Sequence, residues 1–151
     1  MSVIIREGTP KEMVEISWRI PEFENPYGLD EYNQRLSGKN HLLLLAEVNG
    51  QSAGFKAGYE SDLDTFYSWM GGVLPEYRNT GIAKALLAEQ EKRIRKMGYS
   101  VIRIKTRNRH KAMIQFLLKE GFFIVELEKK GKVKDFRVIF EKKITETKLN
   151  P

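Results

Sequence analysis

Cysteine is absent from this sequence of 151 residues. Its absence excludes disulfide bonds, metal sites built from thiolates and a cysteine nucleophile, and it is compatible with a cytoplasmic protein. Long apolar runs are absent as well, because the longest one, at residues 42–46, is far too short to span a bilayer. The first ten residues, MSVIIREGTP, lack the long apolar core of a signal peptide. We therefore expect a cytoplasmic protein that has no membrane partner.

Acidic residues are outnumbered: 20 Asp and Glu stand against 26 Lys and Arg, which gives a formal net charge of +6. A basic protein favours polyanionic partners, such as nucleic acid, acidic lipid or a phosphorylated cofactor. The charge is unevenly placed, since residues 91–111 are strongly basic and residues 22–31 are acidic. This asymmetry indicates two surfaces of opposite sign rather than one nucleic-acid stripe.

The length fits one domain better than two, and a core of that size needs no disulfide or metal. We expect one domain at residues 1–144 and a polar, frayed tail at residues 145–151. Hydrophobic spacing and turn signals, including Asn49-Gly50, predict a mixed α/β domain of α+β type in the order β-α-α-β-β-β-α-β-α-β-β. The predicted strands are residues 3–6, 41–48, 52–59, 65–73, 99–105, 122–128 and 133–142, and the predicted helices are 10–20, 29–36, 82–97 and 112–118.

The stretch YRNTGIAKALL, residues 77–87, follows a predicted strand and opens a predicted helix. The first N–H groups of a helix have no internal partner and carry the positive end of its dipole, so they can bind an anion. Gly81 permits close approach of a ligand, and Arg78 and Lys84 add positive charge. A P-loop is excluded because the Gly-Lys-Ser/Thr ending is missing. Alone, the stretch is also typical of an ordinary helix start.

Its flanking residues extend this pattern. Val73 and Pro75 precede Arg78, Gly81 and Ala83. A second block downstream runs through the strand at residues 101–105, Asn108, Ala112, Phe116, Gly121 and Phe122. The two blocks and the order of elements closely resemble the GNAT superfamily of N-acetyltransferases over nearly the whole chain. This resemblance implies a twisted, mostly antiparallel sheet with one parallel crossover pair, flanked by about four helices.

The resemblance also implies acetyl-coenzyme A (acetyl-CoA) as the cofactor. The backbone of residues 78–84 would bind its pyrophosphate, and the preceding strand would pair with its pantetheine arm. A backbone N–H of that strand would stabilise negative charge on the thioester oxygen. The implied cofactor-binding residues are Gly72, Val73, Leu74, Arg78, Asn79, Thr80, Gly81, Ile82, Ala83, Lys84 and Asn108.

Some of these positions have a second interpretation. Gly71 and Gly72 predict a β-bulge, a close approach of a ligand or simply a strand end. Asn108 is also suited to cap the helix that follows, and both roles can coexist. Three basic residues near it either meet the 3′-phosphate of coenzyme A (CoA) or remain solvated; they are Arg107, Arg109 and Lys111.

The usual acid and base of the family have no counterpart here. Acetyl transfer requires removal of a proton from the ammonium group and protonation of the departing thiolate. Many relatives use a strand glutamate and a helix tyrosine, but the matching positions hold Tyr67, Arg103 and Leu117. None of these is a good general base near neutral pH. The catalytic residues stay unassigned, and we expect a water chain or an amine of low pKa to serve instead.

The acceptor is expected near the loop at residues 21–32, which mixes carboxylates with aromatics and suits an alkylammonium group. The carboxylates are Glu22, Glu24, Asp30 and Glu31. Alternatively, Phe23 and Tyr27 pack the loop and the acids are solvated. Further aromatics that either line a pocket or belong to the core are Trp18, Tyr67 and Trp69. No metal site is expected, because neither histidine, His41 or His110, has other ligands beside it in sequence.

Three functions remain open on the sequence alone. The first is acetyl transfer from acetyl-CoA to a primary amine by direct attack in a ternary complex, on a small molecule or a peptide. The second is a CoA-binding regulatory module without catalysis, because the usual acid and base are missing. The third and weakest is a nucleic-acid-binding protein, because no base-stacking motif accompanies the charge. The resemblance also allows a homodimer through the last strands.

Overall fold

The computed structural model describes residues 2–144. The expected tail at residues 145–151 therefore lies outside the described part. The strands are β1 (Val3–Glu7), β2 (His41–Val48), β3 (Gln51–Asp62), β4 (Thr65–Val73), β5 (Val101–Arg107), β6 (Phe123–Glu128) and β7 (Arg137–Lys143). The helices are α1 (Pro10–Ser17), α2 (Leu29–Leu36), α3 (Ile82–Lys96) and α4 (Lys111–Lys119), with 3₁₀ turns at Pro75–Tyr77 and Val133–Asp135.

The seven strands form a single sheet in the order β1-β2-β3-β4-β5-β7-β6. All neighbours are antiparallel except β4 and β5, which are parallel and joined through α3. A parallel pair requires such a crossover connection, whereas the antiparallel pairs need only short turns. Asn49 and Gly50 both adopt positive φ, 52° and 77°, in the tight turn between β2 and β3. The expected mixed sheet with one parallel crossover is thus confirmed.

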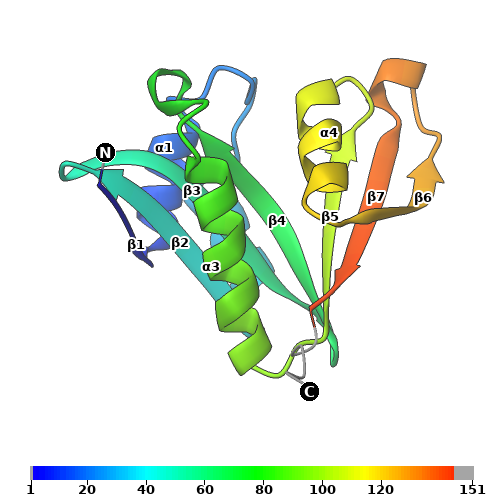
Figure 1. The fold of residues 1–151 in the computed structure, drawn as a ribbon, viewed down its shortest axis with the longest axis horizontal. Coiled ribbons are helices and arrows are strands. Elements are labelled where there is room, and N and C mark those ends of the chain that lie inside the picture. Colours follow the sequence, from blue (N-terminus) through cyan, green and yellow to red (C-terminus); the bar gives the residue numbers. More distant parts are fainter. Residues whose placement is uncertain (1, 145–151) are drawn as a thin grey trace.

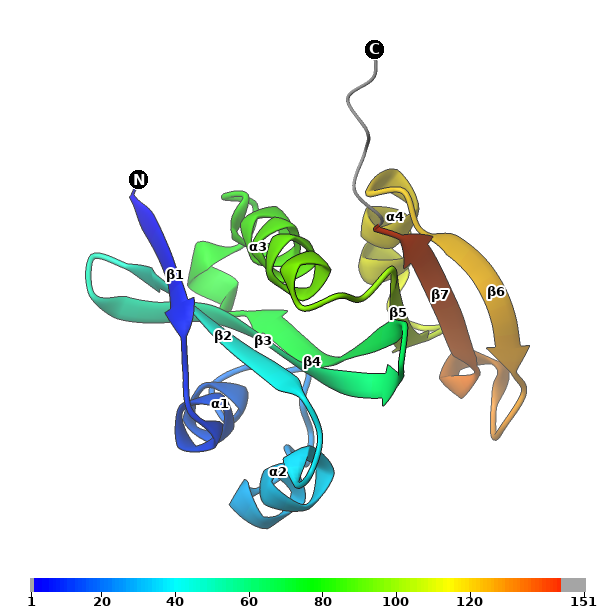
Figure 2. The ribbon, with the colours of Figure 1, turned by 90° about the horizontal axis from the view of Figure 1, so that it is seen from below.

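Helices cover both faces of this sheet (Figure 2): α1 and α2 lie on one face, and α3 and α4 on the other. Each face has its own core. Met13 of α1 and Tyr32 of α2 pack with Phe55 on the first face, while Leu86 of α3 and Leu117 of α4 belong to the core on the second. The two cores fix the sheet between the helix layers, so the backbone of the central strands is held in place from both sides.

The parallel pair holds together over only part of its length. Residues 65–68 of β4 pair with residues 101–104 of β5, and beyond them the strands diverge (Figure 1). A β-bulge lies at this point, because Ala57 pairs with Met70 and Gly58 with Ser68, which leaves Trp69 as an extra residue on β4. A bulge bends its strand and increases the local twist. The β-bulge predicted at Gly71 and Gly72 therefore lies at Trp69 instead.

Several boundaries differ from those expected. The predicted strand at residues 133–142 is broken by a 3₁₀ turn, and the strand proper begins at Arg137. Helix α1 ends at Ser17 rather than at residue 20, although Ile20 is still buried. Helix α3 ends at Lys96 rather than at residue 97, and Met97 is its exposed C-terminal cap residue. Local turns at chain reversals, which hydrophobic spacing does not encode, account for these differences.

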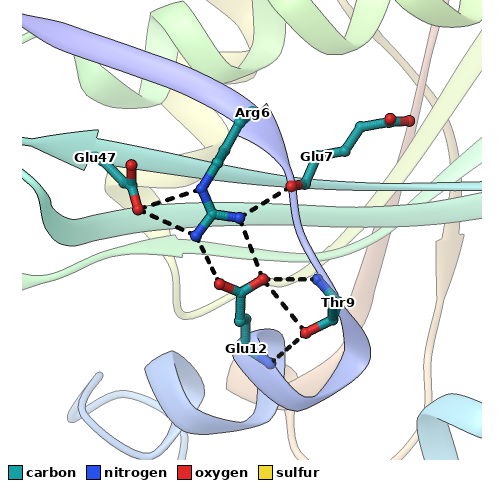
Figure 3. Close-up of polar contacts among 5 residues, drawn as sticks. All are labelled: Arg6, Glu7, Thr9, Glu12 and Glu47. Atoms are coloured by element: carbon teal, nitrogen blue, oxygen red, sulfur yellow. Dashed lines mark hydrogen bonds and ion pairs between the residues drawn. The ribbon is translucent and has the colours of Figure 1, made fainter.

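The N-terminus of α1 is tied to the sheet by an ionic cluster (Figure 3). The Thr9 side chain accepts a hydrogen bond from the Glu12 N–H, and the Glu12 carboxylate accepts one from the Thr9 N–H, which is a capping box. The guanidinium of Arg6 on β1 donates to Glu12 at 2.6 Å and to Glu47 on β2 at 3.1 Å. These bonds hold the pKa of Glu12 below its usual range.

We expect Glu12→Gln to lower the free energy of unfolding by roughly 0.5–1 kcal/mol at neutral pH, since glutamine keeps the cap but loses the charge. A carboxylate with a depressed folded pKa stabilises above its unfolded pKa, near 4.3, and loses that effect as pH falls through the folded pKa. The difference between wild type and variant should therefore shrink below about pH 4 in urea titrations. Glu15→Gln, at an exposed position of the same helix, should change little; a pH-independent difference for Glu12→Gln would contradict this role.

Candidate active site

The N-terminus of α3 leaves backbone donors open. Gly81 precedes the helix in the left-handed region at φ 85°, and no side chain caps it. The Ala85 N–H donates to the Gly81 carbonyl at 3.0 Å, which is the first hydrogen bond of the helix. The three N–H groups before it, at residues 82–84, have no such partner within the helix. Such groups, at the positive end of a 15-residue helix, are suited to an anion.

The loop before α3 has the shape that this site requires. Asn79 and Gly81 both have positive φ, 62° and 85°, so the chain turns sharply into the helix. Apart from its chain neighbours, no atom of residues 2–144 lies within 4 Å of the position where a Cβ of Gly81 would be. The backbone conformation at Gly81 favours glycine, and the space beside it is open. Ala83 and Lys84 are exposed on the same turn.

Arg78 has a different environment from the one expected. Its Nη atoms donate to both oxygens of Glu22 at 2.8 and 2.7 Å, and its Nε donates to the Val73 carbonyl at 3.1 Å. The guanidinium holds the pKa of Glu22 below its usual range. In this arrangement Arg78 joins the loop between α1 and α2 to the end of β4. Its charge is matched by Glu22, and the Lys84 Nζ lies 4.0 Å from a Glu120 carboxylate oxygen. The donors that remain open beside this loop are therefore the first N–H groups of α3.

Beside this anion site, β4 has an open edge. Residues 70–73 pair with β3 on one side, and among residues 2–144 the stretch 69–73 has no strand partner toward β5. The Leu74 N–H donates to Ala53 of β3 at 2.8 Å, so by the alternation of a strand the N–H of Val73 points toward the gap. A Cβ on Gly72 would lie 2.8 Å from the side chain of Ile20. Gly72 thus makes room for the α1–α2 loop, whereas Gly71 faces Lys56 and the Phe55 carbonyl of β3. The open edge can pair with an extended ligand.

Asn108 and its basic neighbours are held by the segment before β7. The Asn108 side chain donates to the Val133 carbonyl at 3.1 Å, and its N–H to the Phe136 carbonyl at 2.8 Å. It does not cap α4, whose cap residue is His110, so that alternative is wrong. Arg107 and Arg109 both form ion pairs with Asp135. Contact of these residues or Lys111 with the cofactor stays a prediction.

The positions of the usual acid and base are occupied by unsuitable groups. Burial raises the pKa of Tyr67 to about 12, so its hydroxyl stays protonated near neutral pH and is not a base. Arg103 donates to Glu141 of β7 at 2.7 Å. Leu117 is fully buried in the core between α4 and the sheet. Burial and the neighbouring Arg109 and Arg107 lower the pKa of His110, partly offset by Glu22, so this imidazole is neutral at pH 7.

Two of the four carboxylates at residues 21–32 form ion pairs within the protein. Glu22 is paired with Arg78, and Glu31 with Arg35 at 2.7 Å. Among the aromatics, Trp69 is buried and packs against Tyr27 and Tyr32 at centroid distances of 5.3 and 4.8 Å, as in the core interpretation. The remaining aromatics divide: Tyr67 lines a surface pocket and Trp18 is exposed to solvent.

Two features are absent from residues 2–144. None of their helices has both the length and the apolar character needed to cross a membrane. Nor do three or more of their histidine, aspartate and glutamate side chains gather into a group that can hold a metal ion.

The sequence profile of the acetyltransferase (GNAT) family matches residues 11–122. An acetyltransferase of Pectobacterium atrosepticum is 30% identical over 116 residues, which cover 76% of each chain. The ribosomal-protein-S18-alanine N-acetyltransferase of Escherichia coli has a similar fold, with a TM-score of 0.83 at 18% identity over 99% of both chains. An N-acetyltransferase of Thermoplasma acidophilum, solved in complex with CoA, has a TM-score of 0.72 at 21% identity over 95% of this chain and 99% of its own.

The open edge of β4 and the uncapped start of α3 are close to one another in the chain. The family profile covers both elements. The chain therefore belongs to the GNAT family of acetyltransferases, with acetyl-CoA as its cosubstrate.

Proposed function

We propose that this protein transfers the acetyl group of acetyl-CoA to a primary amine by direct attack within a ternary complex. The observation that supports this most strongly is the open edge of β4 at residues 69–73, which continues into the uncapped N-terminus of α3. One element suits an extended amide-containing arm and the other suits phosphate groups. The gap between β4 and β5 opens toward both faces of the sheet, the face with α3 and the face with α1 and α2. The two reactants can therefore approach from opposite sides.

In this proposal most contacts to the cofactor come from the backbone. The N–H groups at residues 82–84 and the ammonium of Lys84 bind the pyrophosphate. The residues proposed to contact the cofactor as a whole are 72–74, 78–84 and Asn108. The Val73 N–H stabilises negative charge that develops on the thioester oxygen during attack. A thioester is already activated, so alignment of the amine supplies much of the remaining rate enhancement.

Proton transfer is assigned to water or to an amine of low pKa rather than to a side chain. Tyr67 is protonated, Arg103 is ion-paired and Leu117 is apolar, so none of the three can accept a proton near pH 7. Under this proposal kcat/KM rises with pH until the acceptor amine itself is neutral, because only the free amine attacks.

The test is release of free CoA from acetyl-CoA in the presence of a panel of amines, measured with a thiol reagent. Initial rates with both substrates varied should give intersecting lines, as expected for a ternary complex, whereas parallel lines indicate an acetylated enzyme. Tight binding of acetyl-CoA without transfer to any amine would favour the regulatory module instead. Stabilisation by an oligonucleotide alone, in a thermal shift assay, would contradict the cofactor site.

We also propose that two copies pair through β6, which is the last strand in the sheet order. One edge of β6 pairs with β7, and its other edge has no strand partner among residues 2–144. Its apolar side chains are exposed on both faces, with Phe123 75% exposed. An edge strand is self-complementary when two copies meet antiparallel about a two-fold axis. The occupant of this edge is thus a second copy of the chain.

For this dimer, Phe123→Lys should shift the protein from dimer to monomer in sedimentation-velocity runs, because charge on an edge strand opposes strand pairing. Leu63→Lys, at the exposed β3–β4 turn, is the matched control and should leave the dimer intact. A wild type that sediments as a monomer at all accessible concentrations would contradict the dimer.

A further inference from the structure

A surface pocket of about 350 Å³ lies on the α1–α2 face of the sheet, where β4 and β5 begin to separate. Tyr67 and Arg103 belong to its lining and are partners in the short parallel ladder between these strands. Lys105, which also lines the pocket, follows directly after the last paired residue of β5 on the same face. The pocket therefore adjoins the gap into which the reacting end of an extended cofactor would lead.

This pocket is strongly basic. Its nine lining residues are Arg35, Lys39, Tyr59, Glu60, Ser61, Tyr67, Arg103, Lys105 and Arg137. Five of them are lysine or arginine and only one is a carboxylate. That carboxylate, Glu60, already accepts hydrogen bonds from the Tyr99 hydroxyl at 2.5 Å and from Asn40 at 3.3 Å. The pocket, hereafter the cationic pocket, thus has a clear excess of positive charge.

Two of the five cations are matched inside the protein and three are not. Arg35 pairs with Glu31, and Arg103 pairs with Glu141. Within residues 2–144, no carboxylate oxygen lies within 4.0 Å of the three others, which are Lys39, Lys105 and Arg137. Like charges that gather around one concave site repel each other unless an anion joins them.

Aromatic rings restrain two of these three cations, Lys39 and Lys105. The Lys39 ammonium lies 4.7 Å from the ring centre of Tyr59, and the Lys105 ammonium 5.6 Å from that of Tyr67. The two tyrosine rings contact each other edge to face at 5.6 Å. Cation–π contacts restrain long side chains without neutralising their charge. The cationic pocket is therefore partly preorganised to receive an anionic group.

We propose that the acceptor is a small amine that also carries an anionic group, either a carboxylate or a phosphate, and that the cationic pocket binds that group. This inference rests on the proposed acetyl transfer and specifies its substrate class. Lys105 and Arg137 supply charge-assisted hydrogen bonds to the anion, with Lys39 opposite them. The amine then extends from the pocket toward the gap between β4 and β5, where it is acetylated.

The same charges argue against two other occupants. A polyamine would be repelled by five basic side chains, and two of the four carboxylates expected to attract it, Glu22 and Glu31, are already paired. The 3′-phosphate of CoA is an unsuitable occupant as well, because the N-terminus of α3 lies on the opposite face of the sheet (Figure 2). The pocket is thus distinct from the proposed cofactor-phosphate site.

The test uses wild-type protein saturated with CoA, so that the cofactor-phosphate site is filled. Calorimetry then compares matched amines that differ in the anionic group, namely phosphoethanolamine with ethanolamine, and alanine with alaninamide; spermidine is the polycation. We expect at least one anionic member to bind about tenfold or more tightly than its neutral counterpart. The phosphate and carboxylate pairs tell the two anions apart.

Two variants locate the effect. Lys105→Gln and Arg137→Gln should each weaken binding of the anionic amine by about tenfold and leave the neutral amine unchanged. Lys92→Gln removes the same charge from an exposed position on α3, on the other face, and should change neither. Equal binding of anionic and neutral members, or preferred binding of spermidine, would overturn the inference.

The same amines should then be assayed for CoA release from acetyl-CoA. Selective binding of an anionic amine without any release would leave the pocket assignment standing and refute the proposed acetyl transfer. Release of CoA with neutral amines, without selectivity for anionic ones, would support the proposed acetyl transfer and refute the assignment of the cationic pocket. The two proposals therefore fail in distinguishable ways.

Discussion

Replacement of Ala83 by glutamate should weaken acetyl-CoA binding by about tenfold to a hundredfold. Ala83 is exposed in the first turn of α3, so the longer side chain meets no core residue. A carboxylate there would lie beside the proposed pyrophosphate site. Two like charges 4 Å apart repel by about 4 kcal/mol at the effective dielectric constant near a protein surface, and salt and solvent reduce this figure.

The replacement Ala83→Glu should not lower the stability of the fold. Acidic residues in the first turn of a helix interact favourably with its dipole, so the variant should unfold at or slightly above the wild-type temperature. Ala88→Glu introduces the same charge at an exposed position further along α3 and should bind acetyl-CoA within about threefold of wild type. Calorimetric titration of all three proteins provides the comparison. Unchanged affinity for Ala83→Glu would place the cofactor phosphates elsewhere.

Gly58→Ala should destabilise the protein by roughly 2–3 kcal/mol and lower its melting temperature by about 5–10 °C. A Cβ at this position would lie 2.4 Å from the Phe66 ring and 2.6 Å from the Tyr67 carbonyl oxygen. Gly58 pairs with Ser68, next to the bulged Trp69, so the strain falls at the point where β4 leaves β5. The variant should therefore also bind acetyl-CoA more weakly, in proportion to the distortion of β4.

Gly28→Ala is the matched control for this prediction. No protein atom lies within 4 Å of its hypothetical Cβ, and its φ of −88° suits any residue. Its melting temperature should stay within about 3 °C of wild type, since only the cap of α2 is affected. Differential scanning calorimetry measures both variants. Equal melting temperatures for Gly58→Ala and wild type would show that β4 tolerates the methyl group and would contradict the close packing at the bulge.

Much of the fold can be predicted from the sequence because its signals are local. Asn49-Gly50 encodes a hairpin turn by its tolerance of positive φ, and Thr9 and Glu12 encode a capping box through their spacing. The bulge at Trp69 is not encoded in this way. It depends on contact between β3 and β4, since Gly58 can be recognised as essential only once Phe66 is known to lie above it.

The proposed cofactor site rests on local signals for the same reason. Gly81 adopts a left-handed conformation directly before a helix, and both features can be predicted from a short stretch of sequence. The proposed acceptor site is lined by residues of α2, β3, β4, β5 and β7 and by Lys39, whose side chains meet only in the folded sheet. The basic composition of the chain indicates an anionic partner but does not locate its site, because the basic residues of the cationic pocket are spread from Arg35 to Arg137. The acidic loop, by contrast, suggests a cationic acceptor in sequence, but in the structure Arg78 and Arg35 pair with two of its four carboxylates.

The most direct test of the proposed acetyl transfer is mass spectrometry of the products after wild-type protein is incubated with acetyl-CoA and the amine that binds best. The proposal predicts one N-acetylated amine for each CoA released, no acetyl group on the protein, and a slower reaction for Ala83→Glu at low acetyl-CoA concentration. Acetyl-CoA that binds but stays intact, or an acetyl group that accumulates on the protein, would contradict it.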